Sequence, residues 1–272
     1  MEACINGATT MPYSLEEDLA AAAAAGFTQV ELWAGKLERY LDAHGAGGLR
    51  SALAGHGLRA AAICPFGLRL FGNWREGLPP VERAAALAAE IGCPLLLVCP
   101  DAPGAGERGD GLWAQAGERA RAYAEVVAAA GVRLAVEPLG GHPFVPGPAQ
   151  AMRLLAAAEH PALGLMMDTF HYRKSGVTAA EVDAVPPALW QILHINDIPA
   201  GEASALSDGD RLYPGEGVLP LAATLRHFAE LGYAGAVSVE VFRQAYWKES
   251  IAEINRRAYA GVSAVLRAAG AG

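Results

Sequence analysis

The stretch Leu163-Gly164-Leu165-Met166-Met167-Asp168 is a short apolar run that ends in an acid. A nearly continuous apolar run of this length is typical of a parallel strand covered on both faces of its sheet. Similar runs recur along the chain at intervals close to the roughly 30 residues of a strand–helix–strand unit. They predict eight strands, at residues 4–8, 29–33, 59–64, 94–99, 133–138, 163–168, 191–196 and 236–241.

The segments between these runs carry the start and stop signals of helices. Ser14 and Glu17 have the spacing of a capping box, and Gly26 marks the end of the first helix. Further helices are expected at residues 79–91, 118–130, 219–231 and 247–269. Eight strands that alternate with helices predict a closed (β/α)8 TIM barrel, with residues 1–272 as a single domain. A doubly wound open sheet is the alternative.

The composition limits the function classes. The chain has 272 residues, 53% of them hydrophobic and 18% charged, which excludes wholesale disorder. The formal net charge of -8 argues against nucleic acid and anionic membrane surfaces as partners, because both attract basic proteins. We find no secretory signal or apolar run long enough to span a bilayer. We therefore expect a cytoplasmic protein with reduced, buried thiols at Cys4, Cys64, Cys93 and Cys99.

Four strands in succession offer one potential metal ligand each, at or near the carboxyl end: Glu137, Asp168, His194 and Glu240. In a barrel of this type the carboxyl ends of the strands form the catalytic mouth. Three carboxylates that converge there would repel one another, and a divalent cation would offset that repulsion. Three oxygen ligands and one imidazole suit Mn²⁺, Zn²⁺, Co²⁺ or Mg²⁺, with positions left open for substrate. The sequence therefore predicts one divalent metal ion.

Three more polar residues are expected near the mouth. His171 follows Asp168 by three residues and His142 follows Glu137 by five, so both are expected in loops where an imidazole could bond substrate oxygens. Arg211 lies in the Pro- and Gly-rich segment 210–217 after the seventh strand. An arginine held over the mouth could neutralise a developing oxyanion.

With these residues in place, the chain resembles the xylose-isomerase-like TIM-barrel superfamily of sugar isomerases and epimerases. In that superfamily Glu, Asp, His and Glu from successive strands hold a divalent metal. Within it, the chain most resembles the inosose isomerases of myo-inositol catabolism. The segments that carry this resemblance are NGATT at residues 6–10, GHP at 141–143, DTFH at 168–171, DRLYPGEG at 210–217 and VSVEVFR at 237–243.

The resemblance implies an isomerase that interconverts 2-keto-myo-inositol and a keto-chiro-inositol through an enediolate. Glu137 or Glu240 would remove the proton beside the carbonyl, and the same or the other glutamate would return it to the adjacent carbon. His171 and Arg211 would stabilise the enediolate oxygens. The polyol substrate would also contact three further residues: Asn6, Trp33 and His142. The sequence leaves open whether the chain forms a homo-oligomer.

Other functions fit parts of the same pattern. A ketose 3-epimerase or a hydroxypyruvate isomerase would use the same metal and base. A metal-dependent dehydratase, such as a 3-dehydroshikimate dehydratase, would direct the same enolate to β-elimination. An endonuclease-IV-like nuclease would need extra histidines at strand ends, which the second to fourth strands do not supply, and its substrate would disfavour an acidic protein. A non-catalytic sugar- or metal-binding barrel is the remaining alternative.

Overall fold

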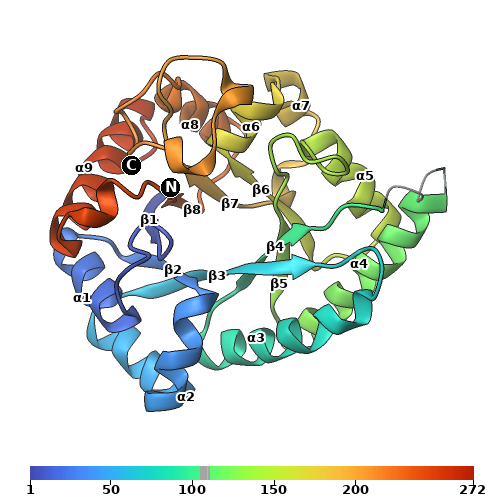
Figure 1. Ribbon diagram of the computed structural model, residues 1–272, viewed down its shortest axis with the longest axis horizontal. Coiled ribbons are helices and arrows are strands. Elements are labelled where there is room, and N and C mark those ends of the chain that lie inside the picture. Colours follow the sequence, from blue (N-terminus) through green and yellow to red (C-terminus); the bar gives the residue numbers. More distant parts are fainter. Residues whose placement is uncertain (105–108, 110) are drawn as a thin grey trace.

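The computed structural model describes residues 1–104, 109 and 111–272, and the strands within them close into one parallel barrel in chain order (Figure 1). Pairing between the first and last strands completes the closure. The predicted TIM barrel is therefore confirmed, and the open sheet is excluded. The strands are β1 (Glu2–Asn6), β2 (Gln29–Trp33), β3 (Arg59–Leu68), β4 (Leu95–Pro100), β5 (Arg133–Val136), β6 (Leu163–Asp168), β7 (Trp190–Ile195) and β8 (Ala236–Val239).

Helices form a ring around the barrel (Figure 1). They bury one face against the outside of the strands, where most of the hydrophobic core lies. In the described part of the chain no helix combines the length and the hydropathy that crossing a bilayer requires. The helices are α1 (Leu15–Ala25), α2 (Ala34–Gly55), α3 (Leu78–Ile91), α4 (Gly111–Ala129), α5 (Pro148–Ala158), α6 (Thr169–Ser175), α7 (Ala179–Asp183), α8 (Leu221–Glu230) and α9 (Ile251–Ala269).

Local sequence signals explain where several of these elements begin and end. The capping box of Ser14 and Glu17 is present at the start of α1, and Gly26 ends that helix in the left-handed conformation. The sequence did not predict α2, which carries several glycines, and at Gly45 its backbone leaves the helical conformation. Helix α4 begins seven residues earlier than expected, and α9 begins at Ile251, after a short 3₁₀ turn, rather than at residue 247.

The barrel interior has an apolar layer beneath a polar one. Side chains alternate along each strand, so residues two apart point to the same face. Met166 and Ile192 are paired in register and belong to the apolar layer. Two residues further along, Asp168 and His194 are paired in the same way and open the polar layer at the carboxyl ends. This period of two places the candidate ligands inside the barrel rather than against the helices.

Candidate active site

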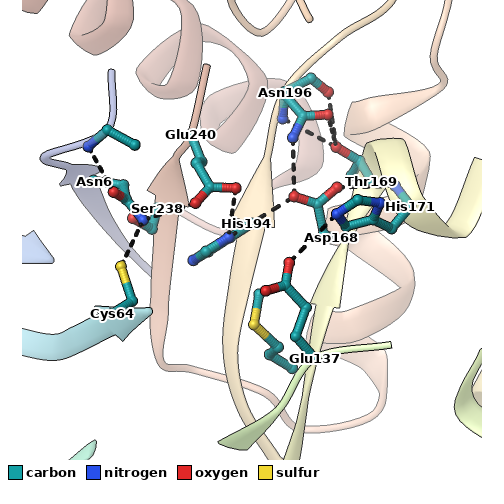
Figure 2. A network of polar contacts seen from close by, with 12 residues as sticks. Asn6, Cys64, Glu137, Asp168, Thr169, His171, His194, Asn196, Ser238 and Glu240 are labelled. Atoms are coloured by element: carbon teal, nitrogen blue, oxygen red, sulfur yellow. Dashed lines mark hydrogen bonds and ion pairs between the residues drawn. The ribbon is translucent and has the colours of Figure 1, made fainter. Parts of the chain in front are cut away.

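The structure brings the four predicted metal ligands together at the carboxyl ends of the strands (Figure 2). Glu137 directly follows β5, Asp168 ends β6, His194 lies near the end of β7, and Glu240 directly follows β8. Each side chain is buried, and one ligand atom from each lies within 4.8 Å of the others. The cluster is thus compact enough for one ion to contact all four residues.

The donor atoms of this cluster suit a divalent cation. His194 Nδ1 lies 3.1 Å from Glu240 Oε2 and 3.8 Å from Asp168 Oδ2. It is buried, yet it makes no hydrogen bond of good geometry with any described residue. A buried nitrogen that faces two carboxylates without bonding to either is an arrangement that a shared cation satisfies. The residues present therefore fit the predicted metal.

Arg211 also belongs to the cluster. Its guanidinium is 1% exposed, and Nη1 lies 2.8 Å from Asp168 Oδ2 and 2.7 Å from Glu240 Oε2. Nη2 lies 2.8 Å from Asp208 Oδ1 and 3.1 Å from His171 Nε2. The expectation that this arginine reaches the mouth holds, although it is buried among the acids rather than suspended over them.

The segment that carries Arg211, residues 207–219, is called the Arg211 loop below. Asp197 lies two residues after β7 and is 1% exposed; it holds this loop through a backbone bridge to Leu212 and through its carboxylate, which accepts from backbone N–H groups. Its Oδ1 accepts from Ile198 and Leu219, both at 2.9 Å, and its Oδ2 accepts from Gly215 at 3.1 Å. Gly217 packs so closely that a Cβ there would lie 2.5 Å from Asp197 Oδ1. The glycines of the PGEG turn thus allow the loop to close onto Asp197.

The charges of the cluster shift its acids in opposite directions. Burial, reinforced by the negative charge of Glu240, raises the pKa of Glu137 to about 8. Burial also opposes ionisation of Asp168, but the nearby Arg211 guanidinium outweighs it and lowers the pKa of Asp168 to about 2. Among the protein groups alone, one carboxyl is therefore poised to hold a proton near neutral pH while its neighbour stays ionised.

His171 lies in the first turn of α6, and the prediction that it occupies a loop is wrong. The side chain of Asp168 caps this helix, because its Oδ1 accepts from the His171 backbone N–H at 3.0 Å. The cap brings the imidazole back to the mouth, where Nε2 lies 3.6 Å from Glu137 Oε1. Burial is the main reason that the pKa of His171 is lowered, so the ring is neutral at pH 7.

The three residues expected to contact substrate have well-defined surroundings. Asn6 lies behind Glu240, with Nδ2 donating to Glu240 Oε1 at 3.1 Å. The ring of Trp33 packs edge-on against Phe242 at 5.8 Å. His142 lies in the loop after β5 and uses Nδ1 to accept two backbone N–H groups of that loop. All three flank the carboxyl ends of the strands, and their contact with substrate stays a prediction.

The sequence analysis missed several residues that touch the cluster. Asn196 Nδ2 donates to Asp168 Oδ2 at 3.2 Å, and Thr169 Oγ1 is bonded to Asn196. The Cys99 thiol donates to Glu137 Oε2 at 3.3 Å. Glu31, in the centre of β2, contacts His194. An acid in the middle of an apolar strand was a signal that could have identified Glu31, because such a group is costly to bury without a partner.

The fold and the site together define a class of protein. It is a (β/α)8 barrel with a buried cluster of three carboxylates and one imidazole at the carboxyl ends of its strands, a candidate centre for one divalent metal. The family model described as xylose isomerase-like TIM barrel matches residues 19–257. The chain therefore belongs to the xylose isomerase-like TIM barrel family.

The individual relatives have low to moderate sequence identity to this chain. The chain is 26% identical over 275 residues to an inosose isomerase of Bacillus velezensis, covering 98% of this chain and 97% of the relative. It is 34% identical over 131 residues to the inosose isomerase of Halalkalibacterium halodurans, a match that spans 46% of that relative. It is also 28% identical over 240 residues to a 3-dehydroshikimate dehydratase of Pseudomonas putida, covering 86% of this chain and 37% of the relative.

A solved structure described as an IOLI protein with a binding zinc atom is similar over the whole fold. The TM-score is 0.89 at 25% identity, with 98% of each chain covered. A protein whose fold is similar to that of this chain over 98% of its length therefore binds a zinc atom.

Proposed function

We propose that this chain is a divalent-metal-dependent isomerase that moves a carbonyl group between adjacent carbons of a keto-inositol, from 2-keto-myo-inositol to a keto-chiro-inositol. The observation that carries the proposal is the buried cluster of Glu137, Asp168, His194 and Glu240, with Arg211 and His171 beside it. The near full-length similarity to an inosose isomerase supports the choice of substrate.

The four residues of the cluster would hold the metal, which is Mn²⁺, Zn²⁺, Co²⁺ or Mg²⁺. When bound, the metal supplies Lewis acidity that makes the carbon-bound proton beside the carbonyl easier to remove. Asp168 is suited to a purely ligating role, because the neighbouring Arg211 guanidinium keeps its pKa at about 2. It would stay ionised throughout the reaction.

Glu137 and Glu240 are the candidates for proton transfer. One carboxylate takes the proton from the hydroxyl-bearing carbon, and the electron pair of that C–H bond forms the double bond of an enediolate. A carboxyl then delivers a proton to the former carbonyl carbon, the proton of the neighbouring hydroxyl passes to the former carbonyl oxygen, and the carbonyl is regenerated at the neighbour. Among the protein groups alone, burial raises the pKa of Glu137 to about 8, and a bound metal would lower it, which favours the ionised form that can remove a proton.

Arg211 and His171 would stabilise the negative charge on the enediolate oxygens. The guanidinium lies 4.8 Å from the ring of Phe170 and 5.3 Å from that of Phe242. These rings keep water from the guanidinium and strengthen its interaction with a charged oxygen. Asn6 would act through Glu240, while Trp33 and His142 would line the substrate.

The test is NMR of 2-keto-myo-inositol in D₂O with the zinc- or manganese-loaded protein and with an EDTA-treated control. We expect metal-dependent deuterium uptake beside the carbonyl and a new keto-inositol. The variant Glu240→Gln should lose turnover while it retains metal, whereas Glu230→Gln, on the outside of α8, should behave as wild type. Full activity of the metal-loaded Glu240→Gln variant would refute the role of that residue. Exchange without a new keto-inositol would instead favour a ketose epimerase.

A dehydratase is the second candidate, because the chain is also similar to a 3-dehydroshikimate dehydratase over 86% of its length. The same proton removal would then be followed by loss of a hydroxyl group from the β-carbon as water. With 3-dehydroshikimate this elimination creates an aromatic ring, which ultraviolet absorbance detects directly. An increase in ultraviolet absorbance with 3-dehydroshikimate, together with no deuterium uptake by 2-keto-myo-inositol, would favour the dehydratase over the isomerase.

A further inference from the structure

Glu31 is a fully buried acid that the proposed reaction does not use. It lies in the centre of β2, is 1% exposed, and reaches across the barrel interior to β7. Its Oε2 lies 2.8 Å from His194 Nε2, and its Oε1 lies 3.1 Å from the same nitrogen. Removing a carboxylate from water in this position costs free energy, so a specific partner must stabilise its charge.

Ser238 holds the carboxylate in place. Its hydroxyl, fully buried on β8, donates to Glu31 Oε2 at 2.8 Å. Ser238 is the register partner of His194 on the neighbouring strand. Figure 2 shows His194 with Ser238 and Glu240 to one side and Asp168 to the other. Three strands thus fix the relative positions of the hydroxyl, the carboxylate and the imidazole.

The two nitrogens of His194 consequently face different partners. Nε2 faces Glu31, whereas Nδ1 faces the metal cluster, 3.1 Å from Glu240 Oε2. A neutral imidazole carries one N–H and one lone pair, and an ionised carboxylate can only accept. When Nδ1 binds a metal its lone pair is used, so the N–H of the imidazole must lie on Nε2, where Glu31 accepts it. A carboxylate behind a ligating histidine orients the ring in this way and increases its basicity.

We propose that Glu31, held by Ser238, is a positioning residue that fixes the tautomer and orientation of His194 so that Nδ1 binds the metal. This role rests on the metal centre of the proposed function, but it does not depend on the substrate or the reaction. Removing such a partner typically lowers metal affinity by about 10- to 100-fold. We expect the smaller effect for Glu31→Gln, whose amide oxygen can still accept the N–H, and the larger for Glu31→Leu.

The experiment measures zinc affinity of the full-length chain by competition with a chromogenic chelator, without substrate. Asp18→Asn is the matched control, because Asp18 is a buried acid that pairs with Lys36 rather than with His194. Its zinc affinity should equal that of the wild type. Ser238→Ala should weaken zinc binding by a few fold, since the carboxylate remains but loses its hydroxyl donor.

Imidazole ¹⁵N NMR of the zinc-loaded protein tests the tautomer of His194 directly. The spectrum would not change if Glu31 served only to stabilise the fold. In the wild type we expect a protonated Nε2 and a zinc-bound Nδ1 for His194, and in Glu31→Leu a second population with the nitrogens exchanged. Wild-type affinity and a wild-type spectrum in the Glu31 variants would overturn the positioning role alone. If Glu31→Leu fails to fold, Glu31→Gln and Ser238→Ala decide the question. A wild-type chain that does not bind zinc would overturn the metal centre itself.

Discussion

The substitution Asp197→Asn tests how the Arg211 loop is held in the site. Asp197 offers three carboxylate bonds to backbone N–H groups, two at Oδ1 and one at Oδ2. Asparagine can keep one oxygen for Ile198 and Leu219, but it presents an NH₂ group to the N–H of Gly215. The variant therefore loses one charge-assisted hydrogen bond and weakens two others, without a large change in side-chain volume.

The expected loss of folding stability follows from these hydrogen bonds. A hydrogen bond to a charged group contributes about 1.5–3 kcal/mol, so we expect the free energy of unfolding to fall by about 2–3 kcal/mol. The entropy of unfolding is about 2.1 cal/mol/K per residue, or about 0.6 kcal/mol/K for this chain. The melting temperature should therefore fall by about 4–5 °C.

Calorimetry measures the global effect, and hydrogen exchange followed by mass spectrometry measures the local one. Exchange should accelerate mainly in residues 207–219, because the loop loses its side-chain anchor and keeps only its backbone bonds to residues 197 and 198, while the barrel strands lose nothing. Glu202→Gln, an exposed change in the same connection between β7 and α8, should leave both measurements unchanged. An Asp197→Asn protein with wild-type melting temperature and wild-type exchange in the Arg211 loop would show that the carboxylate does not anchor it.

Three other perturbations have expected outcomes. Burial raises the pKa of Asp18 to about 6 in the folded chain. The folded chain therefore binds the carboxyl proton more tightly than the unfolded chain does. This contribution to the free energy of unfolding is present below about pH 4 and is lost as the pH rises through 6. Between pH 4.5 and 7.5 the unfolding free energy of Asp18→Asn should thus gain about 2 kcal/mol relative to wild type in urea titrations; a constant difference would contradict this. Zinc at 100 times its dissociation constant should stabilise the protein by about 2.7 kcal/mol, and EDTA should lower the calorimetric melting temperature by about 5 °C, whereas equal values count against the metal centre. Burial, reinforced by Glu137, raises the pKa of the Cys99 thiol, so brief iodoacetamide treatment at pH 7.5 should leave it unmodified, and rapid alkylation in peptide maps would disprove that.

Much of the fold and half of the site could be predicted from local sequence. Continuous apolar runs identified the strands, and the polar residues at their carboxyl ends identified the candidate ligands. In a parallel barrel every strand ends at the same rim, so residues at strand ends such as Asp168 and Glu240 had to lie near one another. Helices with clear caps, such as α1, were predicted closely, whereas the glycine-containing α2 was not.

The contacts across the barrel could not be read from the sequence. Glu31 and His194 are separated by 163 residues and meet only because the barrel closes with a particular register. Arg211 comes from a polar loop, and its burial depends on the anchor at Asp197 and on two acids from other strands. The sequence determined which end of each strand carries the chemistry. Only the tertiary structure decided which side chains pair there, because strand closure and loop docking set distances that no local pattern encodes.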